Sequence, residues 1–248
     1  MMKRVFRPTL GATLFTIPAV IVMLGLCVWQ VQRLYWKEAL INERIERTTA
    51  APIALPEADT KLDDVEFRRV ALRGQFDHAH EFLMPARSQN GNVGFWIVTP
   101  FHLDNGGGNV LINRGWVPDG FQNPAQRLSG QLEGSISFDS ILRLPQAKSW
   151  FQPDNEPPNN RWFYLAPSEM AAASGLSFRT DLYLDAVKMD IPGNYPLGGQ
   201  TRIHLRNDHL QYAITWGSLT IALIVIYVIS SYTGAAPMPQ TPHNGQKD

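Results

Sequence analysis

Two long stretches without a charged residue lie near the two ends of this 248-residue chain, and they constrain its fold more than any other feature. The first stretch covers 8–32 and the second covers 210–233. About 20 apolar residues in a helix are enough to cross ~30 Å of hydrocarbon. The sequence therefore predicts two transmembrane helices, at 9–32 and 209–233, with the rest of the chain between them.

The first stretch also has a rival interpretation as a secretory signal peptide, because three basic residues precede it as a charged n-region would. The apolar run is longer than the usual signal, and bulky Trp29 follows it where small residues are expected. Cys27 ends a sequence that resembles a lipoprotein cleavage box, but Leu26 occupies the position that normally needs a small side chain. We therefore expect an uncleaved anchor without a lipid on Cys27.

The order of the segments along the chain predicts which ends of the two spans lie at the same face of the membrane. Because one domain, 33–208, joins the two spans, the end of the first and the start of the second must lie at the same membrane face. Basic residues precede and follow the first span and also precede the second, so the positive-inside rule does not decide the orientation. We expect an extracytoplasmic domain, with 1–8 and 234–248 as cytoplasmic tails, the second of them disordered because it is polar and rich in proline.

Composition excludes some function classes. The formal net charge is zero, so the charge balance gives no reason to expect nucleic acid as a partner. The single cysteine, Cys27, lies inside a predicted span, which excludes a disulfide within the chain and a thiolate cluster for a metal.

The intervening domain has a mainly β pattern. Residues 30–49 lack glycine and proline and are expected to continue the first helix until Pro52. Short segments rich in branched and aromatic residues then predict an antiparallel sheet or small barrel. The predicted strands are Val65–Phe76, Phe95–Phe101, Asn109–Val117, Ile136–Leu144, Asp181–Met189 and Thr201–Leu205. A short helix is expected at Pro167–Ser174, with Gly175 at its end. The predicted fold class is a membrane α+β protein, with two transmembrane helices flanking a mainly antiparallel-β extramembrane domain that contains a short helix.

Most local motifs in the domain favour a structural interpretation. The glycine-rich run at 104–108 precedes a strand-like segment and is interpreted as a hairpin turn rather than a phosphate loop. His78, His80 and Glu81 could place two imidazoles on one face for a metal, but without a third well-placed ligand a solvated strand edge is favoured. No Ser/His/Asp arrangement or glycine-flanked nucleophile stands out, so no catalytic residue is predicted and the protein is not expected to be an enzyme.

His209 lies at the boundary of the second predicted span. Tyr212 and Trp216 follow it at spacings of three and seven, so all three side chains share one helical face. Aromatic residues at this depth commonly anchor a helix at the interface, whereas an ionisable residue in a span is by default a functional candidate. The sequence leaves His209 open between a ligand and a structural residue.

The chain also resembles the Surfeit-locus-1 family, the assembly factors of cytochrome c oxidase. The run Trp29-Gln-Val-Gln-Arg33 with Trp36-Lys37 is similar to a signature at the end of that family's first span. Further similarity covers nearly the whole chain in the same order. It is carried by Gly74-x-Phe76, Arg87, Gly94, Thr99-Pro100, Val110-Leu-Ile-Asn-Arg-Gly-Trp-Val-Pro118, Phe151-x-Pro153-x-Asn155, Trp162 and Asn207-Asp-His-Leu-Gln-Tyr-Ala-Ile-Thr-Trp216. Asp208 stands where that family commonly has asparagine.

The resemblance implies a multi-pass protein of the bacterial inner membrane, with its large domain on the periplasmic side, that assists insertion of haem a into oxidase subunit I. Its partners would be that subunit, the proteins that synthesise or deliver haem a, and the lipid bilayer. His209 would be the axial ligand of the haem iron. Arg33, Arg202 and Arg206 would supply cations for the propionates. The implied cofactor-binding residues are Trp29, Gln30, Arg33, Arg206, His209, Tyr212 and Trp216.

Three interpretations stay open on sequence alone. The Asn113-Arg-Gly-Trp116 run would be either a surface for a partner or a determinant of the fold. A membrane scaffold would bind oxidase subunits without carrying haem. A membrane-anchored enzyme would need a reactive constellation in the domain.

Overall fold

The structure, a computed structural model, describes residues 4–234. Its contacts divide the chain into two compact units, one formed by the chain up to Leu40 together with the chain from Leu205 onward, and the other by Ile41–His204. The first helix, α1 (Leu10–Thr49), runs through the boundary between the two units. Each unit is described by itself.

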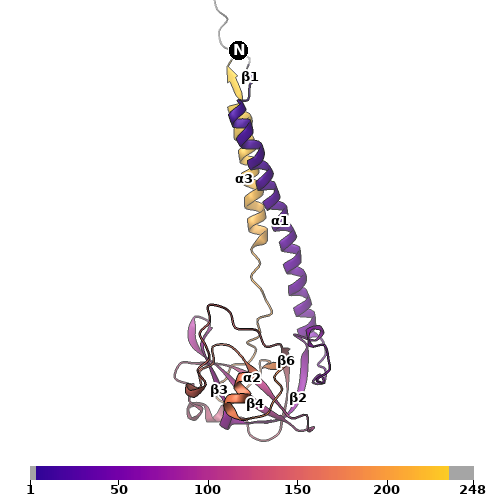
Figure 1. Cartoon of the computed structure of the whole chain (residues 1–248), viewed down its shortest axis with the longest axis vertical. Helices are drawn as coiled ribbons and strands as arrows, with labels where there is room; N and C mark the ends of the chain where they lie inside the picture. Colours follow the sequence, from indigo (N-terminus) through magenta and orange to yellow (C-terminus); the bar gives the residue numbers. More distant parts are fainter. Residues whose placement is uncertain (1–3, 235–248) are drawn as a thin grey trace, which may run out of the picture. The chain divides into compact units, whose positions relative to one another are not determined.

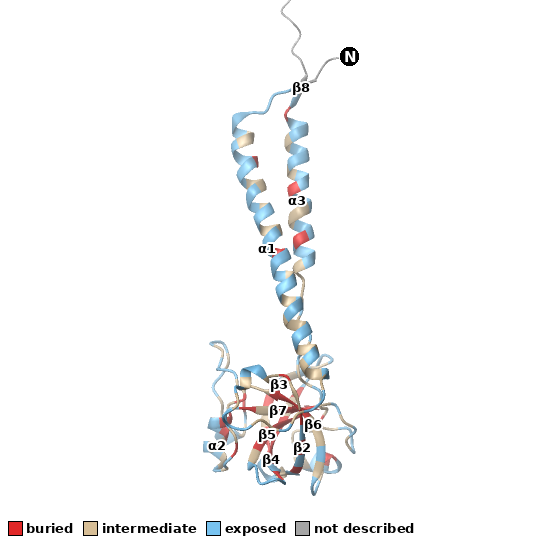
Figure 2. Ribbon diagram, turned by 90° about the vertical axis from the view of Figure 1, so that its right-hand side faces the viewer, coloured by how far each residue is buried: buried red, intermediate tan, exposed pale blue. Residues whose placement is uncertain are grey.

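The first unit is a pair of long helices, α1 and α3 (His209–Ser230), that lie side by side in Figures 1 and 2. The helices are antiparallel: Thr13 Oγ1 lies 2.7 Å from the hydroxyl of Tyr227, and the Cys27 thiol donates to the carbonyl oxygen of Ala213 at 3.4 Å. Both are long and apolar enough to cross a membrane, judged by length and composition. Most of their apolar side chains are exposed (Figure 2), as the lipid-facing side of a span would be.

Local chemistry explains where α1 begins and ends. The Thr9 hydroxyl accepts a hydrogen bond from the backbone N–H of Ala12 at 3.4 Å, which caps the first turn. Pro18 lies inside the helix without ending it. The helix stops at Thr49, shortly before Pro52. The predicted continuation of the first helix out of the span is therefore confirmed.

The second long helix ends earlier than predicted, at Ser230 rather than at Thr233. The backbone N–H and the hydroxyl of Ser231 both donate to the carbonyl oxygen of Tyr227, at 3.0 and 2.7 Å, and close the last turn of the helix. The chain then forms a short strand, β8 (Tyr232–Gly234), antiparallel to β1 (Arg4–Phe6). Apart from Gly234, the predicted disordered tail at 234–248 lies outside the described residues.

The second unit contains a six-stranded sheet in the order β2-β6-β7-β5-β4-β3, and an additional β2–β4 pairing closes five of the strands into a ring. All pairings are antiparallel except β5–β7. Strand β3 is attached outside the ring and pairs only with β4 among the named strands. The strands are β2 (Arg69–Phe76), β3 (Phe82–Gln89), β4 (Asn92–Leu103), β5 (Asn109–Pro118), β6 (Ile136–Arg143) and β7 (Tyr183–Ala186).

The sheet confirms the predicted small β domain and corrects two of its strands. Thr201–Leu205 was expected to be a strand but forms none, because the strands of the ring are already paired on both sides and the Thr201 hydroxyl instead donates to Asp185. Strand β3 was not predicted. It contains Pro85, which lies in an irregularity of the β3–β4 register between Met84 and Arg87, where a strand tolerates proline.

One predicted turn and one predicted helix are confirmed. The glycine-rich run joins β4 to β5 as a hairpin, with the backbone N–H of Leu103 donating to the Gly108 carbonyl at 3.0 Å. The short helix α2 covers Pro167–Ser174. Gly175 ends it with a φ of 69°, a left-handed conformation that glycine adopts at little cost.

Strand β5 has a hydrophobic cluster on each face. Val110 and Ile112 point into the cluster enclosed by the ring, and Leu111 belongs to a second cluster that includes Trp162 and Met170 of α2. Because both faces are covered, eight consecutive residues of β5 are buried (Figure 2). This strand is the centre of the domain.

Candidate functional site

The first residue of α3, His209, is hydrogen-bonded to α1. Its Nδ1 lies 2.7 Å from Oε1 of Gln30, and the ring of Trp29 packs edge-to-face against the imidazole with centroids 6.4 Å apart. Connectivity required the end of the first span and the start of the second to lie at one depth. The structure brings three of the predicted site residues, Trp29, Gln30 and His209, into contact.

The hydrogen bond determines what the imidazole can do. An amide oxygen only accepts hydrogen bonds, so Nδ1 of His209 carries the proton and donates it to Gln30. In the neutral ring Nε2 then holds the lone pair, which is the form that binds a metal. Within the described residues, 4–234, no side-chain or backbone group hydrogen-bonds this Nε2.

An open hollow of about 410 Å³ adjoins the imidazole, lined by Lys37, Arg206, Asp208, His209 and Tyr212. Arg206 forms an ion pair with Asp208, whose backbone carbonyl also accepts from the N–H of Tyr212 at 3.2 Å. Lys37 makes no ion pair within the chain from residue 4 to residue 234. The hollow therefore combines an imidazole, an aromatic ring and a free ammonium group. That donor set fits a flat, partly apolar ligand with a metal centre and carboxylates.

The remaining predicted site residues contribute less. Arg33 stacks on the ring of Trp36, with its guanidinium carbon 4.2 Å from the ring centroid, and does not line the hollow. Trp216 is half-buried on α3 but makes no aromatic contact with His209 in the described part of the chain. Lys37, which lines the hollow, was missing from the predicted site. Lys37 belongs to the signature run that begins at Trp29 and lies one helical turn beyond Arg33, so the sequence could have indicated it as a further cation of the site.

A second set of polar residues, inside the β domain, was also missed. Glu81 is only 8% exposed, and its Oε1 accepts hydrogen bonds from Nη1 of Arg114 and from Nη1 of Arg127, each at 3.0 Å. His78 joins the cluster: its Nε2 donates to the Leu132 carbonyl at 2.9 Å, and Nδ1 lies 3.2 Å from Nη1 of Arg114. Both arginines are buried.

This cluster corrects the interpretation of 78–81 as a solvated strand edge. His78–His80 is a short 3₁₀ turn, and Glu81 is enclosed because two arginines from other elements pair with it. Burial would raise the pKa of Glu81, but the neighbouring His78, the hydrogen bonds from Arg127 and the charges of Arg127 and Arg114 lower it to about 2. Burial lowers the pKa of Arg114 to about 10, despite the opposing charge of Glu81. The group is an internal ion-pair network without access for a substrate.

The Asn113-Arg-Gly-Trp116 run is buried in β5, which favours the fold-determinant interpretation over a partner surface. Asn113 Nδ2 donates to Oδ1 of Asp185 at 2.8 Å. Trp116 Nε1 donates to the Arg87 carbonyl at 3.0 Å. Burial raises the pKa of Asp185, and the charge of Arg143 opposes that rise. These side chains hold β5 to its neighbours.

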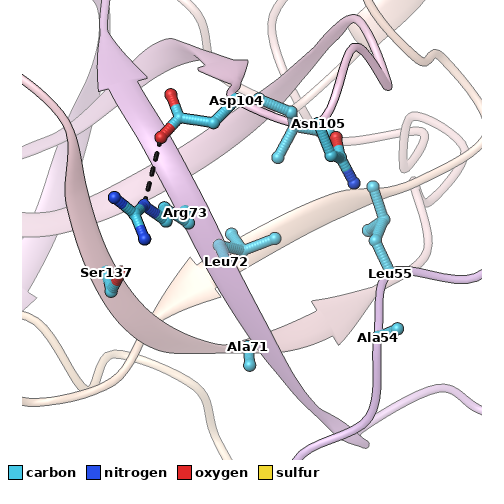
Figure 3. A pocket seen from close by; sticks show the side chains of 9 residues that line it. Ala54, Leu55, Ala71, Leu72, Arg73, Asp104, Asn105 and Ser137 are labelled. Atoms are coloured by element: carbon cyan, nitrogen blue, oxygen red, sulfur yellow. Dashed lines mark ion pairs between the residues drawn. The ribbon is translucent and has the colours of Figure 1, made fainter.

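A pocket of about 620 Å³ in the β domain lies over β2. Figure 3 shows Arg73 and Asp104 facing each other across its rim, with Arg73 Nε 3.3 Å from Asp104 Oδ2. Leu55 and Leu72 line the pocket as well. No group of three or more histidine, cysteine or acidic residues able to hold a metal occurs among residues 4–234.

Fold and site together define a class of protein in which two helices long enough to cross a membrane flank a small β-barrel domain, and a histidine hydrogen-bonds the two helices to each other. The sequence profile of the SURF1 family matches residues 17–221, so this chain belongs to the SURF1 family. The resemblance predicted from the motifs is confirmed.

Relatives share this similarity over most of their length. Surfeit locus protein 1 of Homo sapiens is 39% identical over 214 residues, which cover 80% of this chain and 70% of that protein. The Surfeit locus protein 1 of Takifugu rubripes is 36% identical over 214 residues, covering 80% and 88%. A SURF1-like protein of Drosophila melanogaster is 38% identical over 231 residues, covering 86% and 74%.

Proposed function

We propose that this protein is a membrane-bound assembly factor for haem-copper cytochrome c oxidase that binds haem a at His209 and assists its insertion into subunit I. Membership of the SURF1 family supports the oxidase class, because the sequence motifs resemble its assembly factors. The observation that carries the haem proposal is the imidazole of His209, bonded through Nδ1 to Gln30 with Nε2 free, beside the hollow. When bound, the haem would supply an iron that accepts an axial imidazole.

The residues around the hollow have matching roles. Nε2 of His209 would ligate the iron, and the ring of Tyr212 would cover part of the macrocycle. Lys37 and Arg206 would bind the carboxylates, Lys37 more strongly because Asp208 already pairs with Arg206. The site would lie at the outer face of the bacterial inner membrane, and the length and apolar composition of α1 and α3 support only that both cross a membrane.

A spectroscopic comparison tests this proposal. The full-length protein is expressed in cells that synthesise haem a, purified in detergent, and compared with His209→Ala. His204→Ala is the matched control, because His204 is an exposed histidine a few residues away. We expect the wild type and His204→Ala to carry haem a with the same spectrum, and His209→Ala to lose the haem or its axial-ligand bands. Equal spectra for wild type and His209→Ala would exclude His209 as the ligand.

A scaffold without haem is the second candidate, favoured by an exposed aromatic pair in the β domain. Trp150 is 94% exposed and Phe151 70% exposed, which is unusual for large apolar side chains outside a contact surface. If neither wild type nor His209→Ala carries haem, and Trp150→Ser with Phe151→Ser abolishes copurification with subunit I, the scaffold function is supported instead.

A further inference from the structure

Gln30 is a buried polar side chain on an otherwise apolar helix segment. It is 8% exposed, and its described hydrogen-bond partner is Nδ1 of His209. A buried amide without a partner is destabilising, so this contact satisfies a group that apolar surroundings would not tolerate. Gln32, two residues further along the same helix, is exposed and forms no side-chain hydrogen bond within the described residues.

The contact controls the chemistry of the imidazole as well as its position. Because the amide oxygen of Gln30 accepts from Nδ1, the proton is held on the nitrogen that faces α1. The lone pair is therefore held on Nε2. The edge-to-face contact with Trp29 restricts the ring further. In metal sites, a hydrogen bond from the nitrogen that does not bind the metal fixes the ring and raises its basicity.

We propose that Gln30 is a positioning residue that holds His209 in the Nδ1–H tautomer and so presents the Nε2 lone pair to the metal of a bound ligand. This inference uses the proposed haem site for the identity of the metal, but the tautomer itself belongs to the protein without ligand. Removal of the Gln30 acceptor leaves Nδ1 without a partner and lets the ring rotate and exchange tautomers.

The first test needs no ligand. The full-length protein is labelled with ¹⁵N-histidine in detergent micelles, and the His209 signals are identified by their loss in His209→Gln. Wild type is expected to show protonated Nδ1 and unprotonated Nε2. Gln30→Leu and Gln30→Asn are expected to show a mixture of tautomers or protonated Nε2, and Gln32→Leu is expected to match wild type. The same tautomer in wild type and both Gln30 variants would overturn the proposal, as would protonated Nε2 in wild type.

The second test uses haem a. Removal of the residue that hydrogen-bonds a metal ligand typically weakens metal binding ~10- to 100-fold. We expect Gln30→Leu to weaken the binding of haem a by this factor. Gln30→Glu restores an acceptor for Nδ1, so it should restore binding and lower the reduction potential of the haem, since a carboxylate makes the imidazole more electron-rich. A purely packing role of Gln30 would leave the haem affinity of Gln30→Leu, whose side chain has a similar volume, close to that of wild type.

The two tests separate this inference from the proposed function. If wild type shows the Nδ1–H tautomer, the Gln30 variants lose it, and neither wild type nor any variant binds haem, the positioning role of Gln30 is supported and the haem proposal fails. If wild type binds haem through His209 but Gln30→Leu keeps the same tautomer and affinity, the haem proposal holds and the role of Gln30 is wrong.

Discussion

Nη1 of Arg114 lies 3.0 Å from Oε1 of Glu81 inside the β domain, and the side chains are only 2% and 4% exposed. Arg114 comes from β5 and Glu81 from the residue before β3, so the ion pair ties the central strand to the edge of the sheet. A buried ion pair gains little over apolar residues, but removal of one partner leaves an uncompensated charge at a cost of about 3–5 kcal/mol. The cluster is therefore a place where single substitutions have large effects.

Glu81→Gln is expected to destabilise the domain by about 3 kcal/mol near pH 7, since the pKa of Glu81 is lowered from 4.5 to about 2 in the folded protein. Because the pKa of Glu81 is lower in the folded than in the unfolded chain, ionised Glu81 stabilises the fold at pH values above its ordinary pKa of 4.5, and this stabilisation is lost as the pH falls toward 2. The difference between wild type and variant should therefore shrink from pH 4.5 toward pH 2. Denaturant unfolding followed by tryptophan fluorescence measures it.

The matched control for this substitution is Glu133→Gln, because Glu133 is exposed and forms no ion pair among residues 4–234. Its effect should stay within about 0.5 kcal/mol. A stability difference for Glu81→Gln that does not depend on pH would show that the carboxylate charge is not the cause.

Gly115→Ala is expected to prevent stable folding. Gly115 has a φ of 127°, and an added Cβ would lie 1.9 Å from the carbonyl oxygen of Leu197, which no L residue can accommodate without movement of the backbone. Gly120→Ala is the control, because Gly120 also has a positive φ, 92°, but open space around it. Its cost should be about 1 kcal/mol. Thermal unfolding of both variants measures the difference, and equal losses would mean that close packing at Gly115 is unimportant.

Lys37→Gln is expected to weaken haem a binding ~5- to 10-fold, because one charge-assisted hydrogen bond to a carboxylate is worth about 1–1.5 kcal/mol at a partly exposed site. Lys37→Arg should keep most of the affinity. Titration with haem a at two salt concentrations measures the effect, and the contribution of Lys37 should decrease at high salt. Unchanged affinity in Lys37→Gln would remove Lys37 from the site.

Deletion of the gene is expected to lower the amount of assembled haem-a oxidase while the unassembled subunits are still made. Haem content and oxidase activity of membranes measure this, with subunit levels as the control. The wild-type chain should restore activity, and His209→Ala should restore less. Normal oxidase in the deletion strain, in the absence of a second related gene, would contradict the assembly function.

Much of the fold was predictable because it depends on local chemistry. The length of α1 follows from the uncharged stretch at 8–32 and from the absence of glycine and proline at 30–49, before Pro52. The helix α2 was predicted correctly because Gly175 supplies the left-handed end that a helix needs. Strand β3 was not predictable by the same rules. Pro85 removes a backbone donor, and the irregular β3–β4 register between Met84 and Arg87, which forms only in the assembled sheet, makes that acceptable.

Part of the candidate site was predictable from the sequence, and part was not. The sequence indicated His209 because an imidazole at the end of an apolar run is unusual, and the requirement that both spans meet at one face placed Trp29 and Gln30 near it. It did not show which nitrogen of His209 is bonded, or that Lys37 rather than Arg33 lines the hollow. Those facts depend on the rotation of each helix about its own axis, which packing decides.

The sequence by itself determined the two apolar helices, the β domain between them and the family to which the chain belongs. Each of these follows from composition, periodicity or motifs within short segments. Only the tertiary structure decided that Glu81 is buried against Arg114 and that Gln30 faces His209, residues that are 33 and 179 positions apart. Long-range contacts form where burial of one group must be balanced by a partner, and the chain reveals that partner only when it is folded.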